Sequence, residues 1–359
     1  MSASAHVSNT LAAVTTMLHN NGYQFEVVSS GNGALLLLPK FGRVLGLWSD
    51  TQADCHFWIN PQLLMSSATD FCKDDARWAN PGGHRIWLAP EREFFIHDLS
   101  HPFETYQVPS AIDPGNYKCT YDSLSVQLYN SGRLRAFVSQ TDCDFKIMRT
   151  ISLLPGSEIF KLTKKTQIQA VGYRESIDLA VDNGCPAGIW SLIQVPLRGT
   201  ISMPVSRSGS HKIFFGNEGN IVNYGNGLLN LNLTPDPRQE FKIGFKVSDC
   251  GDIITCLHIY PDESATLIVN KFGPGTESVY VDTPWNQPED TGYAVQFFCG
   301  GIHGFGELET HGSVYKSIEG YCESKLTIFV YAFSGQRELI TQIQNNILNC
   351  SKHELTHRA

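Results

Sequence analysis

The chain has 359 residues, of which 42% are hydrophobic and 17% are charged, so it holds enough apolar material for a large core and is not a disordered chain. The formal net charge is -8, with 35 acidic and 27 basic residues. Such a surface repels phosphate groups, and we therefore expect neither nucleic acid nor an anionic membrane as a partner.

The sequence shows no targeting signal. Residues 1–6 lack the basic region and apolar run of a signal peptide, and the longest apolar run, 34–39, is far shorter than the ~18 residues of a membrane span. We therefore expect a cytoplasmic protein. Its cysteines form no CxxC pair and have no zinc-site spacing, which favours buried or idle thiols; they stand at 55, 72, 119, 143, 185, 250, 256, 299, 322 and 350.

The first predicted element is a helix over 8–20. Ser8 can cap it, apolar residues recur at helical spacing, and the Asn-Asn-Gly run at 20–22 ends it. A second helix is predicted after Ser334, where apolar residues again fall on one face.

Between these helices the chain predicts strands. Short apolar runs alternate with Gly, Asn, Asp and Pro, as in strands joined by tight turns. The runs are 25–28, 34–38, 44–48, 124–128, 145–154, 166–173, 188–195, 199–205, 242–247, 253–260, 265–270, 293–299 and 326–333. Together with the segments below they predict roughly fifteen strands and two short terminal helices. Strands with so few helices can bury themselves only against each other, which predicts an all-β, sheet-on-sheet fold. No linker divides the chain, so we expect a single domain over 1–359.

The first segment that suggests chemistry is 80–91, where two glycines precede a predicted strand. Period-two geometry places Arg85 and Trp87 on one face of that strand and His84 on the other. A guanidinium beside an indole suits a polyhydroxylated ring, because the first donates forked hydrogen bonds and the second can stack. The alternative is an arginine paired to a carboxylate beside a core tryptophan.

The second segment is the glycine-rich run 299–312. It places Glu307, Glu309 and His311 on one face of a strand, ~6.8 Å apart per repeat. Such a row can supply a general base and a general acid, because neighbouring carboxylates raise each other's pKa. The alternative is an edge strand with one solvated face, but a merely solvated strand does not need the preceding glycines. His303, within those glycines, is a candidate ligand contact.

Three other candidate residues are more typical of the hydrophobic core than of a site. His56 and Trp58 fall on one face of a possible strand, and His258 lies between apolar neighbours. There is no GxSxG elbow, phosphate-binding loop or HExxH motif, and no dinucleotide pattern. Glu307, Glu309, His311 and His84 could form a mixed metal site, but their spacing is not diagnostic. We predict no cofactor and no tightly bound transition metal.

At these segments the chain resembles a known superfamily. Residues 82–91, GGHRIWLAPE, are similar to the GGxRxWx[AG]PE element of uncharacterised bacterial families with the galactose mutarotase-like fold. Further similar pieces follow in the same order, at 42–46, 57–61, 149–154, 188–190 and 241–244. The resemblance spans about 40–330 and implies a β-supersandwich of two large antiparallel sheets.

The resemblance also implies roles for some residues. Residues 308–311, LETH, are similar to the LETQ-like element whose glutamate deprotonates the anomeric hydroxyl in mutarotases. This makes Glu309 the candidate base, with His311 in place of the family's glutamine. The mutarotase acid is a histidine from an earlier segment, for which His84 is the nearest candidate. The NHLHGG-type context of that histidine is absent here.

Three functions remain open from the sequence. The first is a proton-transfer enzyme on a carbohydrate or polyol, such as an epimerase, mutarotase or lyase, with Glu309 as base and His84 or His311 as acid. Its expected ligand contacts are Arg85, Trp87, Glu91, Glu307 and His303. The second is a sugar-binding module without catalysis. The third is a glycoside hydrolase with Glu91 and Glu309 as paired carboxylates. The same fold hosts all three classes.

Overall fold

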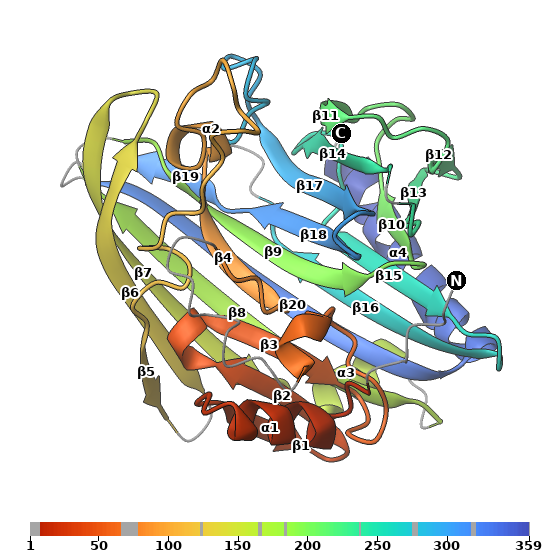
Figure 1. The fold of residues 1–359 in the computed structure, drawn as a ribbon. Coiled ribbons are helices and arrows are strands. Elements are labelled where there is room, and N and C mark those ends of the chain that lie inside the picture. Colours follow the sequence, from red (N-terminus) through yellow and green to blue (C-terminus); the bar gives the residue numbers. More distant parts are fainter. Residues whose placement is uncertain are drawn as a thin grey trace.

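The computed structural model describes residues 8–65, 78–122, 125–163, 167–182, 185–236, 238–274, 279–316 and 321–358. Within them, two large antiparallel sheets pack face to face, and helices lie around their edges and over one outer face (Figure 1). The all-β prediction of two large antiparallel sheets is therefore confirmed. Each sheet takes strands from both halves of the chain. The single domain over 1–359 remains a prediction.

The first sheet has nine strands, and its central strands come from distant parts of the sequence. In spatial order they are β1 (Glu26–Ser30), β2 (Gly33–Leu38), β3 (Arg43–Trp48), β4 (His84–Ala89), β9 (Gly188–Pro196), β18 (Phe305–His311), β17 (Tyr293–Gly300), β14 (Glu240–Lys246) and β11 (Lys212–Gly216). Trp87 pairs with Trp190, and Glu307 pairs with Gln194. This register places the two segments singled out in the sequence, β4 and β18, on either side of β9.

The second sheet has eleven strands, including the longest ones. In spatial order they are β12 (Val222–Gly225), β13 (Leu228–Asn232), β10 (Thr200–Pro204), β15 (Ile253–Ile259), β16 (Ser264–Phe272), β20 (Cys322–Gln336), β8 (Gln169–Val181), β7 (Thr141–Leu153), β6 (Val126–Ala136) and β5 (Lys118–Tyr121), with β19 (Ser313–Lys316) beside β20. In β6 and β7 buried and exposed residues alternate along most of the strand, as expected for one face packed and one solvated.

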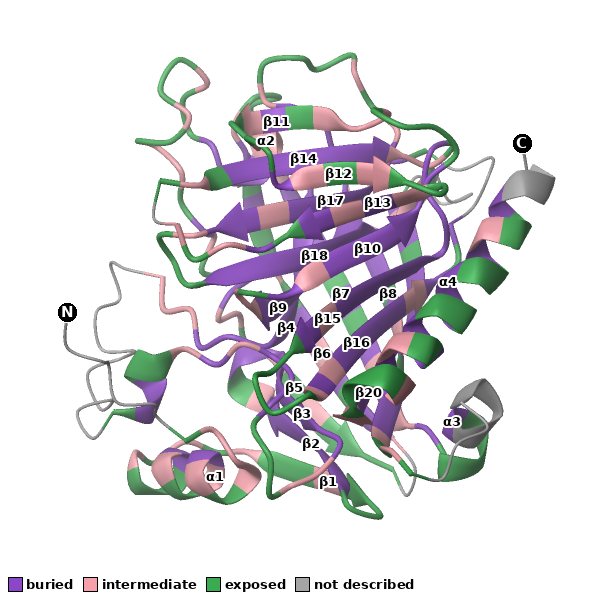
Figure 2. Cartoon of the chain, turned by 90° about the vertical axis from the view of Figure 1, so that its right-hand side faces the viewer, coloured by how far each residue is buried: buried purple, intermediate pink, exposed green. Residues whose placement is uncertain are grey.

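The helical elements are α1 (Leu11–Asn20), η1 (Pro39–Phe41), η2 (Pro61–Leu64), α2 (Glu91–Phe94), α3 (Gly156–Thr163) and α4 (Arg337–Arg358). α4 covers the outer face of the eleven-stranded sheet, where Ile340, Ile343 and Ile347 pack with Leu267 and Phe333. Figure 2 shows the strands mostly buried and the outward side of α4 exposed. The main core lies between the two sheets.

Several sequence predictions need correction. The described residues form twenty strands rather than fifteen, because short strands such as β12 and β13 are held by pairing and carry little pattern of their own. The last helix is not short, since α4 has 22 residues. α1 is capped by Thr10 rather than Ser8, with the Thr10 Oγ1 accepting from the Ala13 amide at 3.4 Å.

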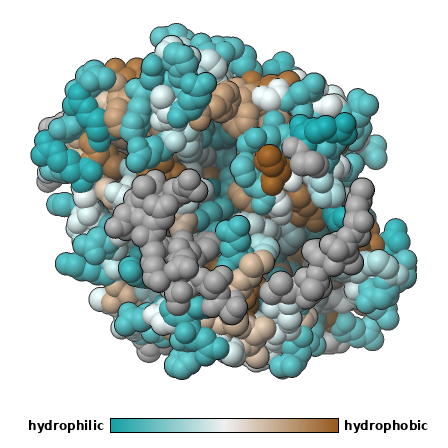
Figure 3. Space-filling view, in the orientation of Figure 1, coloured by the Kyte–Doolittle hydropathy of each residue, from teal (hydrophilic) through white to brown (hydrophobic). Residues whose placement is uncertain are grey.

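Other predictions concern the surface and the thiols. Seven of the nine cysteines in the described ranges are buried, as predicted, whereas Cys72 lies outside those ranges. Residues 1–6 also lie outside them. None of the helices in the described residues is both long and apolar enough to cross a membrane. The face seen in Figure 3 is largely hydrophilic, with scattered apolar patches.

Candidate functional site

A cavity of about 1680 Å³ lies on the outer face of the nine-stranded sheet. The alternation of β4 defines this face: Arg85 and Trp87 line the cavity, whereas His84 points toward β8 of the other sheet. Glu91, Glu307, Glu309 and His303 also line it. Six of the eight predicted site residues are thus brought together, and His84 and His311 are not among the lining residues.

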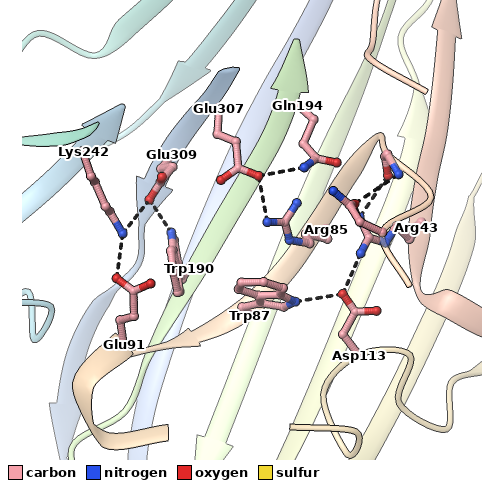
Figure 4. A network of polar contacts seen from close by, with 12 residues as sticks. Arg43, Arg85, Trp87, Glu91, Asp113, Trp190, Gln194, Lys242, Glu307 and Glu309 are labelled. Atoms are coloured by element: carbon pink, nitrogen blue, oxygen red, sulfur yellow. Dashed lines mark hydrogen bonds and ion pairs between the residues drawn. The ribbon is translucent and has the colours of Figure 1, made fainter. Parts of the chain in front are cut away.

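Glu309 is the most deeply buried carboxyl group of the cavity lining. Its Oε2 accepts a hydrogen bond from Trp190 Nε1 at 2.7 Å and lies 3.2 Å from Lys242 Nζ (Figure 4). The same ammonium group lies 3.0 Å from Glu91 Oε2, and Tyr106 donates to Glu91 Oε1 at 3.0 Å. Lys242 therefore joins two carboxyl groups that come from β18 and α2.

The ionisation of this cluster is set by burial and by mutual charge. Burial raises the pKa of the Glu309 carboxyl to about 8, with Lys242 acting in the opposite direction and Glu307 and Glu91 adding to the rise. Burial lowers the pKa of Lys242, but the Glu309 and Glu91 carboxylates outweigh it, so the pKa lies above its usual range. Lys242 thus stays cationic while Glu309 exchanges its proton near neutral pH.

Arg85 forms a second cluster beside the first. Its NH2 donates to Glu307 Oε1 at 2.7 Å, and Gln194 Nε2 donates to the same oxygen at 2.9 Å (Figure 4). The Nε and NH1 atoms of Arg85 have no hydrogen-bond partner in the structure. The carboxylate therefore holds one arm of the guanidinium, whereas the Nε and Nη1 donors are unpaired and buried in a side chain that lines the cavity.

The Trp87 ring packs against the Arg85 guanidinium. The Arg85 guanidinium carbon lies 4.1 Å from the centre of the Trp87 ring. The indole Nε1 donates to Asp113 Oδ2 at 3.0 Å, and that oxygen also accepts from Arg43 NH2 at 2.6 Å. Trp87 is only 3% exposed and packs against Trp190. The ring is thus covered by protein, and it positions Arg85 rather than offering an open face for stacking.

His84 is enclosed between the two sheets. Its Nε2 lies 2.9 Å from Ser191 Oγ, and its Nδ1 lies 2.9 Å from Tyr173 Oη and 3.2 Å from Glu175 Oε2. Burial, followed by the charges of Arg149 and other arginines, lowers the pKa of His84 well below its usual range. Since His84 does not reach the cavity, we give it no part in the chemistry proposed below.

His311 follows Glu307 and Glu309 on the same face of β18, as predicted, but it lies beyond the end of the cavity. Its ring stacks on Trp190 with centroids 6.0 Å apart. Burial and the nearby Lys242 cation lower the pKa of His311 well below its usual range, and neither ring nitrogen has a partner in the structure. It is a neutral side chain behind Trp190 rather than a group of the cavity wall.

The interpretation of β18 as a solvated edge strand is wrong. β18 lies between β9 and β17, and all seven of its residues are buried. The preceding glycines have a packing role: a Cβ at Gly301 would lie 2.0 Å from the Asp236 carbonyl oxygen. Gly304 has a φ of +84°, which favours glycine. The turn holds His303 at the cavity rim, half exposed and 3.1 Å from Glu240.

The weaker candidates also have clear places. His56 is buried and bonds to Ser49 Oγ at 2.8 Å, and His258 is buried with Nε2 2.9 Å from the Pro196 carbonyl, as predicted for core histidines. Trp58 differs, because it is only partly buried and lines the cavity. Residues 54–60 form no strand apart from one bridge at Ile59.

The sequence analysis missed several groups of this site. Lys242 interrupts an apolar strand, and a lone lysine inside such a run is a signal for a buried cation with acidic partners. Trp190 belonged to the similar piece 188–190 but was given no role, and Gln194 was marked only by its place on a predicted strand. Asp113 comes from a loop, and no local pattern indicated its role.

Metal and cofactor binding were considered separately. Among the residues that the structure describes, no group of three or more His, Cys, Asp or Glu side chains is placed to hold a metal ion. In the cavity Glu307 and Glu309 are engaged by Arg85 and Lys242, and His84 lies on the opposite face. A site without a tightly bound metal or cofactor remains our prediction.

The two packed antiparallel sheets have the galactose mutarotase-like fold. A solved structure described as a "putative aldose 1-epimerase" from Klebsiella pneumoniae is 8% identical, with 92% of this chain and 87% of that chain covered and a TM-score of 0.50. A galactose mutarotase-like protein from Lactobacillus casei is 11% identical, with 86% and 100% covered and a TM-score of 0.46. At such identities the likeness shows the fold alone.

The chain belongs to the family described as "Family of unknown function (DUF6786)", which matches residues 10–359. No curated protein matches the chain.

Proposed function

We propose that the cavity binds a sugar and that the protein is an epimerase- or mutarotase-like enzyme in which Glu309 transfers the proton. The observation that carries this proposal is Glu309 itself. It is a buried carboxyl group on the wall of a large cavity, with a pKa raised to about 8 and with a permanent cation beside it. A group that changes charge near neutral pH is suited to general acid–base catalysis.

Arg85 supplies the main binding contact in this proposal. A sugar presents hydroxyl oxygens that accept hydrogen bonds, and Arg85 has two donors without a partner. Burial makes an unsatisfied donor costly, so a ligand oxygen there gains the full benefit of the bond. Glu307 and Trp87 hold the guanidinium in place from two directions.

The reaction is then a balanced proton exchange. The Glu309 carboxylate accepts the proton of the anomeric hydroxyl, the bond between the anomeric carbon and the ring oxygen breaks, and the ring oxygen takes a proton. A water molecule supplies that second proton and is restored by the proton on Glu309, because both oxygens of Glu91 accept hydrogen bonds, one from Lys242 and one from Tyr106. Rotation about the bond to the former anomeric carbon and the reverse steps give the other anomer. A lyase would use Glu309 on a C–H bond instead.

Glycoside hydrolysis is the second candidate, and the Lys242 contacts favour it specifically. Glu91 and Glu309 lie 3.0 and 3.2 Å from one ammonium nitrogen. This closeness is compatible with a separation of about 5 Å between the two carboxyl groups, as in retaining glycosidases. A sugar-binding module without turnover would use Arg85 in the same way and would not need Glu309.

The test is a thermal-shift screen of the purified protein against neutral and acidic mono- and disaccharides, followed by NMR of every compound that raises the melting temperature. We expect a hit that is lost in Arg85→Ala and kept in Glu309→Gln. NMR then separates anomeric exchange from cleavage, and Glu309→Gln is expected to lower turnover by about 10²- to 10⁴-fold. Glu263→Gln, at a carboxylate outside the cavity, is the matched control.

The outcomes distinguish the candidates. If turnover is unchanged in Glu309→Gln, Glu309 does not transfer the proton. If no turnover is found for any sugar that binds, the protein is a binding module. Release of a free sugar from a disaccharide, with loss of activity in Glu91→Gln as well, would favour the hydrolase. No shift with any sugar would end the carbohydrate proposal.

A further inference from the structure

We propose that the ligand is a neutral oligosaccharide rather than a single sugar: one unit lies over Arg85 and Glu309, and the chain continues across an aromatic rim. This inference rests on the proposed function, since it extends the same cavity. The rim is defined as Trp58, Phe103, Phe215, Phe298 and Phe305, all of which line the cavity.

The rim rings form a connected path. Trp58 and Phe305 have centroids 4.6 Å apart, and Phe305 lies 5.9 Å from Phe298. Phe298 lies 6.3 Å from Phe215, which in turn lies 5.4 Å from Phe103. The rings come from β11, β17, β18 and two loops. Such a row offers successive apolar faces, and the C–H face of a sugar ring stacks on such surfaces.

Exposure separates these rings from core aromatics. Trp58, Phe215 and Phe298 are only partly buried, and Phe103 is 64% exposed. Phe305 is buried, at 8% exposure, and links the partly exposed rings to one another. A partly exposed row of aromatic rings at the mouth of a polar cavity is typical of a binding surface. Trp87 and Trp190, by contrast, are buried below the polar groups. The cavity therefore has a polar floor and an aromatic extension.

The cavity is also larger than one sugar requires. Its volume is about 1680 Å³, whereas pockets for drug-sized ligands commonly have about 300–1,000 Å³. The polar groups that could fix one sugar ring, Arg85, Glu309 and Glu91, belong to the two neighbouring clusters on the floor. The remaining space beside the rim is sufficient for further units.

Charge indicates that these units are neutral. Five carboxyl side chains line the cavity, against three cationic ones; they are Glu91, Asp113, Glu240, Glu307 and Glu309, against Arg85, Arg92 and Lys242. Arg85 and Lys242 are already paired with Glu307 and Glu309. A phosphate or uronate group would therefore find neither of these two cations free, whereas hydroxyl groups need no counterion.

The test measures affinity against chain length by calorimetry. The probes are glucose and galactose, their linear di-, tri- and tetrasaccharides in α and β linkage, and glucuronate and glucose 6-phosphate as charged comparisons. We expect the trisaccharide of the preferred series to bind at least about tenfold more tightly than its monosaccharide. Phe103→Ala and Phe215→Ala should each remove about three- to tenfold of that gain and leave monosaccharide affinity unchanged.

Two controls keep the test specific. Phe103→Trp keeps a stacking surface and should retain the gain, and Tyr121→Ala removes a side chain of similar exposure (56%) from β5 of the other sheet and should have no effect. Equal affinity for all chain lengths, with binding still lost in Arg85→Ala, would overturn this inference and leave the proposed function intact. Tighter binding of the charged probes would also overturn it. Absence of binding by every neutral sugar would end both proposals.

Discussion

Two clusters of buried charged side chains lie on opposite faces of β4, and only one of them reaches the cavity. On the inner face His84 contacts Glu175, which pairs with Arg149 at 2.5 Å. On the outer face Arg85 pairs with Glu307 at 2.7 Å. Both clusters consist of arginine and glutamate in an apolar setting, and both perturb the groups around them.

The difference between them is access rather than charge. Both ring nitrogens of His84 have protein partners, and Arg149 also donates to the Gly42 carbonyl. Each cluster keeps buried donors without a partner, Nη2 in Arg149 and Nε and Nη1 in Arg85, but only Arg85 lines the cavity. A strongly shifted pKa therefore does not identify the functional histidine here, because the shift of His84 results from burial between the sheets. We therefore propose that the inner cluster serves stability and the outer cluster serves ligand binding.

The largest effect that separates the two clusters is expected for Glu175→Ala. Removal of this carboxylate leaves Arg149 as a buried charge without its counterion, which typically destabilises a protein by about 3–5 kcal/mol. We expect the loss in the free energy of unfolding, measured by urea denaturation. Sugar affinity, measured per folded molecule, should not change.

The matched control is Asp178→Ala. Asp178 lies on the same strand, β8, in an exposed ion pair with Lys325 at 3.4 Å. Exposed pairs contribute little, so the unfolding midpoint should stay close to that of the natural protein. A Glu175→Ala variant that is as stable as this control would contradict the structural assignment of the inner cluster.

The pH dependence of turnover tests the outer cluster. If Glu309 acts as the base, only its carboxylate form is active, and its pKa is raised to about 8. Below that pH the rate should therefore rise about tenfold per pH unit, and above it the rate should level off. The measurement is kcat/KM between pH 5.5 and 9.5 on the substrate found in the sugar screen.

Two other shapes of this profile have clear meanings. A rate that falls as pH rises through 8 would make Glu309 the acid and Glu91 the base. A flat profile would exclude Glu309 from proton transfer. Glu309→Gln should abolish the inflection, because glutamine does not titrate.

The fold was predictable because it depends on patterns within each strand. Alternating residues on 84–89 and 305–311 correctly indicated which side chains share a face, and the scarcity of helices correctly indicated packed sheets. What local pattern could not give is the neighbour of each strand. The pattern of β18 left an edge strand open as an alternative, and only its pairing with β9 and β17 shows that it is central.

The same limit explains what was missed in the site. The row Glu307, Glu309, His311 was correct as a row, but period-two geometry does not say where the cavity ends, and Trp190 covers His311. Lys242 comes from a strand far away in sequence, and its two carboxylate contacts depend on long-range pairing. A histidine therefore looked like the partner of Glu309, while the structure places a lysine there.

The smallest expected effect is that of Arg85→Lys, which tests the difference between the two clusters most directly. Lysine keeps the positive charge for Glu307 but not the fixed fork of donors, in which Nε and Nη1 of Arg85 are unpaired. If Arg85 acts mainly in ligand binding, the dissociation constant of the sugar should rise about tenfold, whereas stability should change little. Calorimetry and urea denaturation measure the two quantities, and Arg207→Lys, at an exposed position, serves as control. A loss of stability with unchanged affinity would show that Arg85 forms a structural ion pair, like the arginine of the inner cluster. In that case, lining a cavity would not be enough to identify a binding residue.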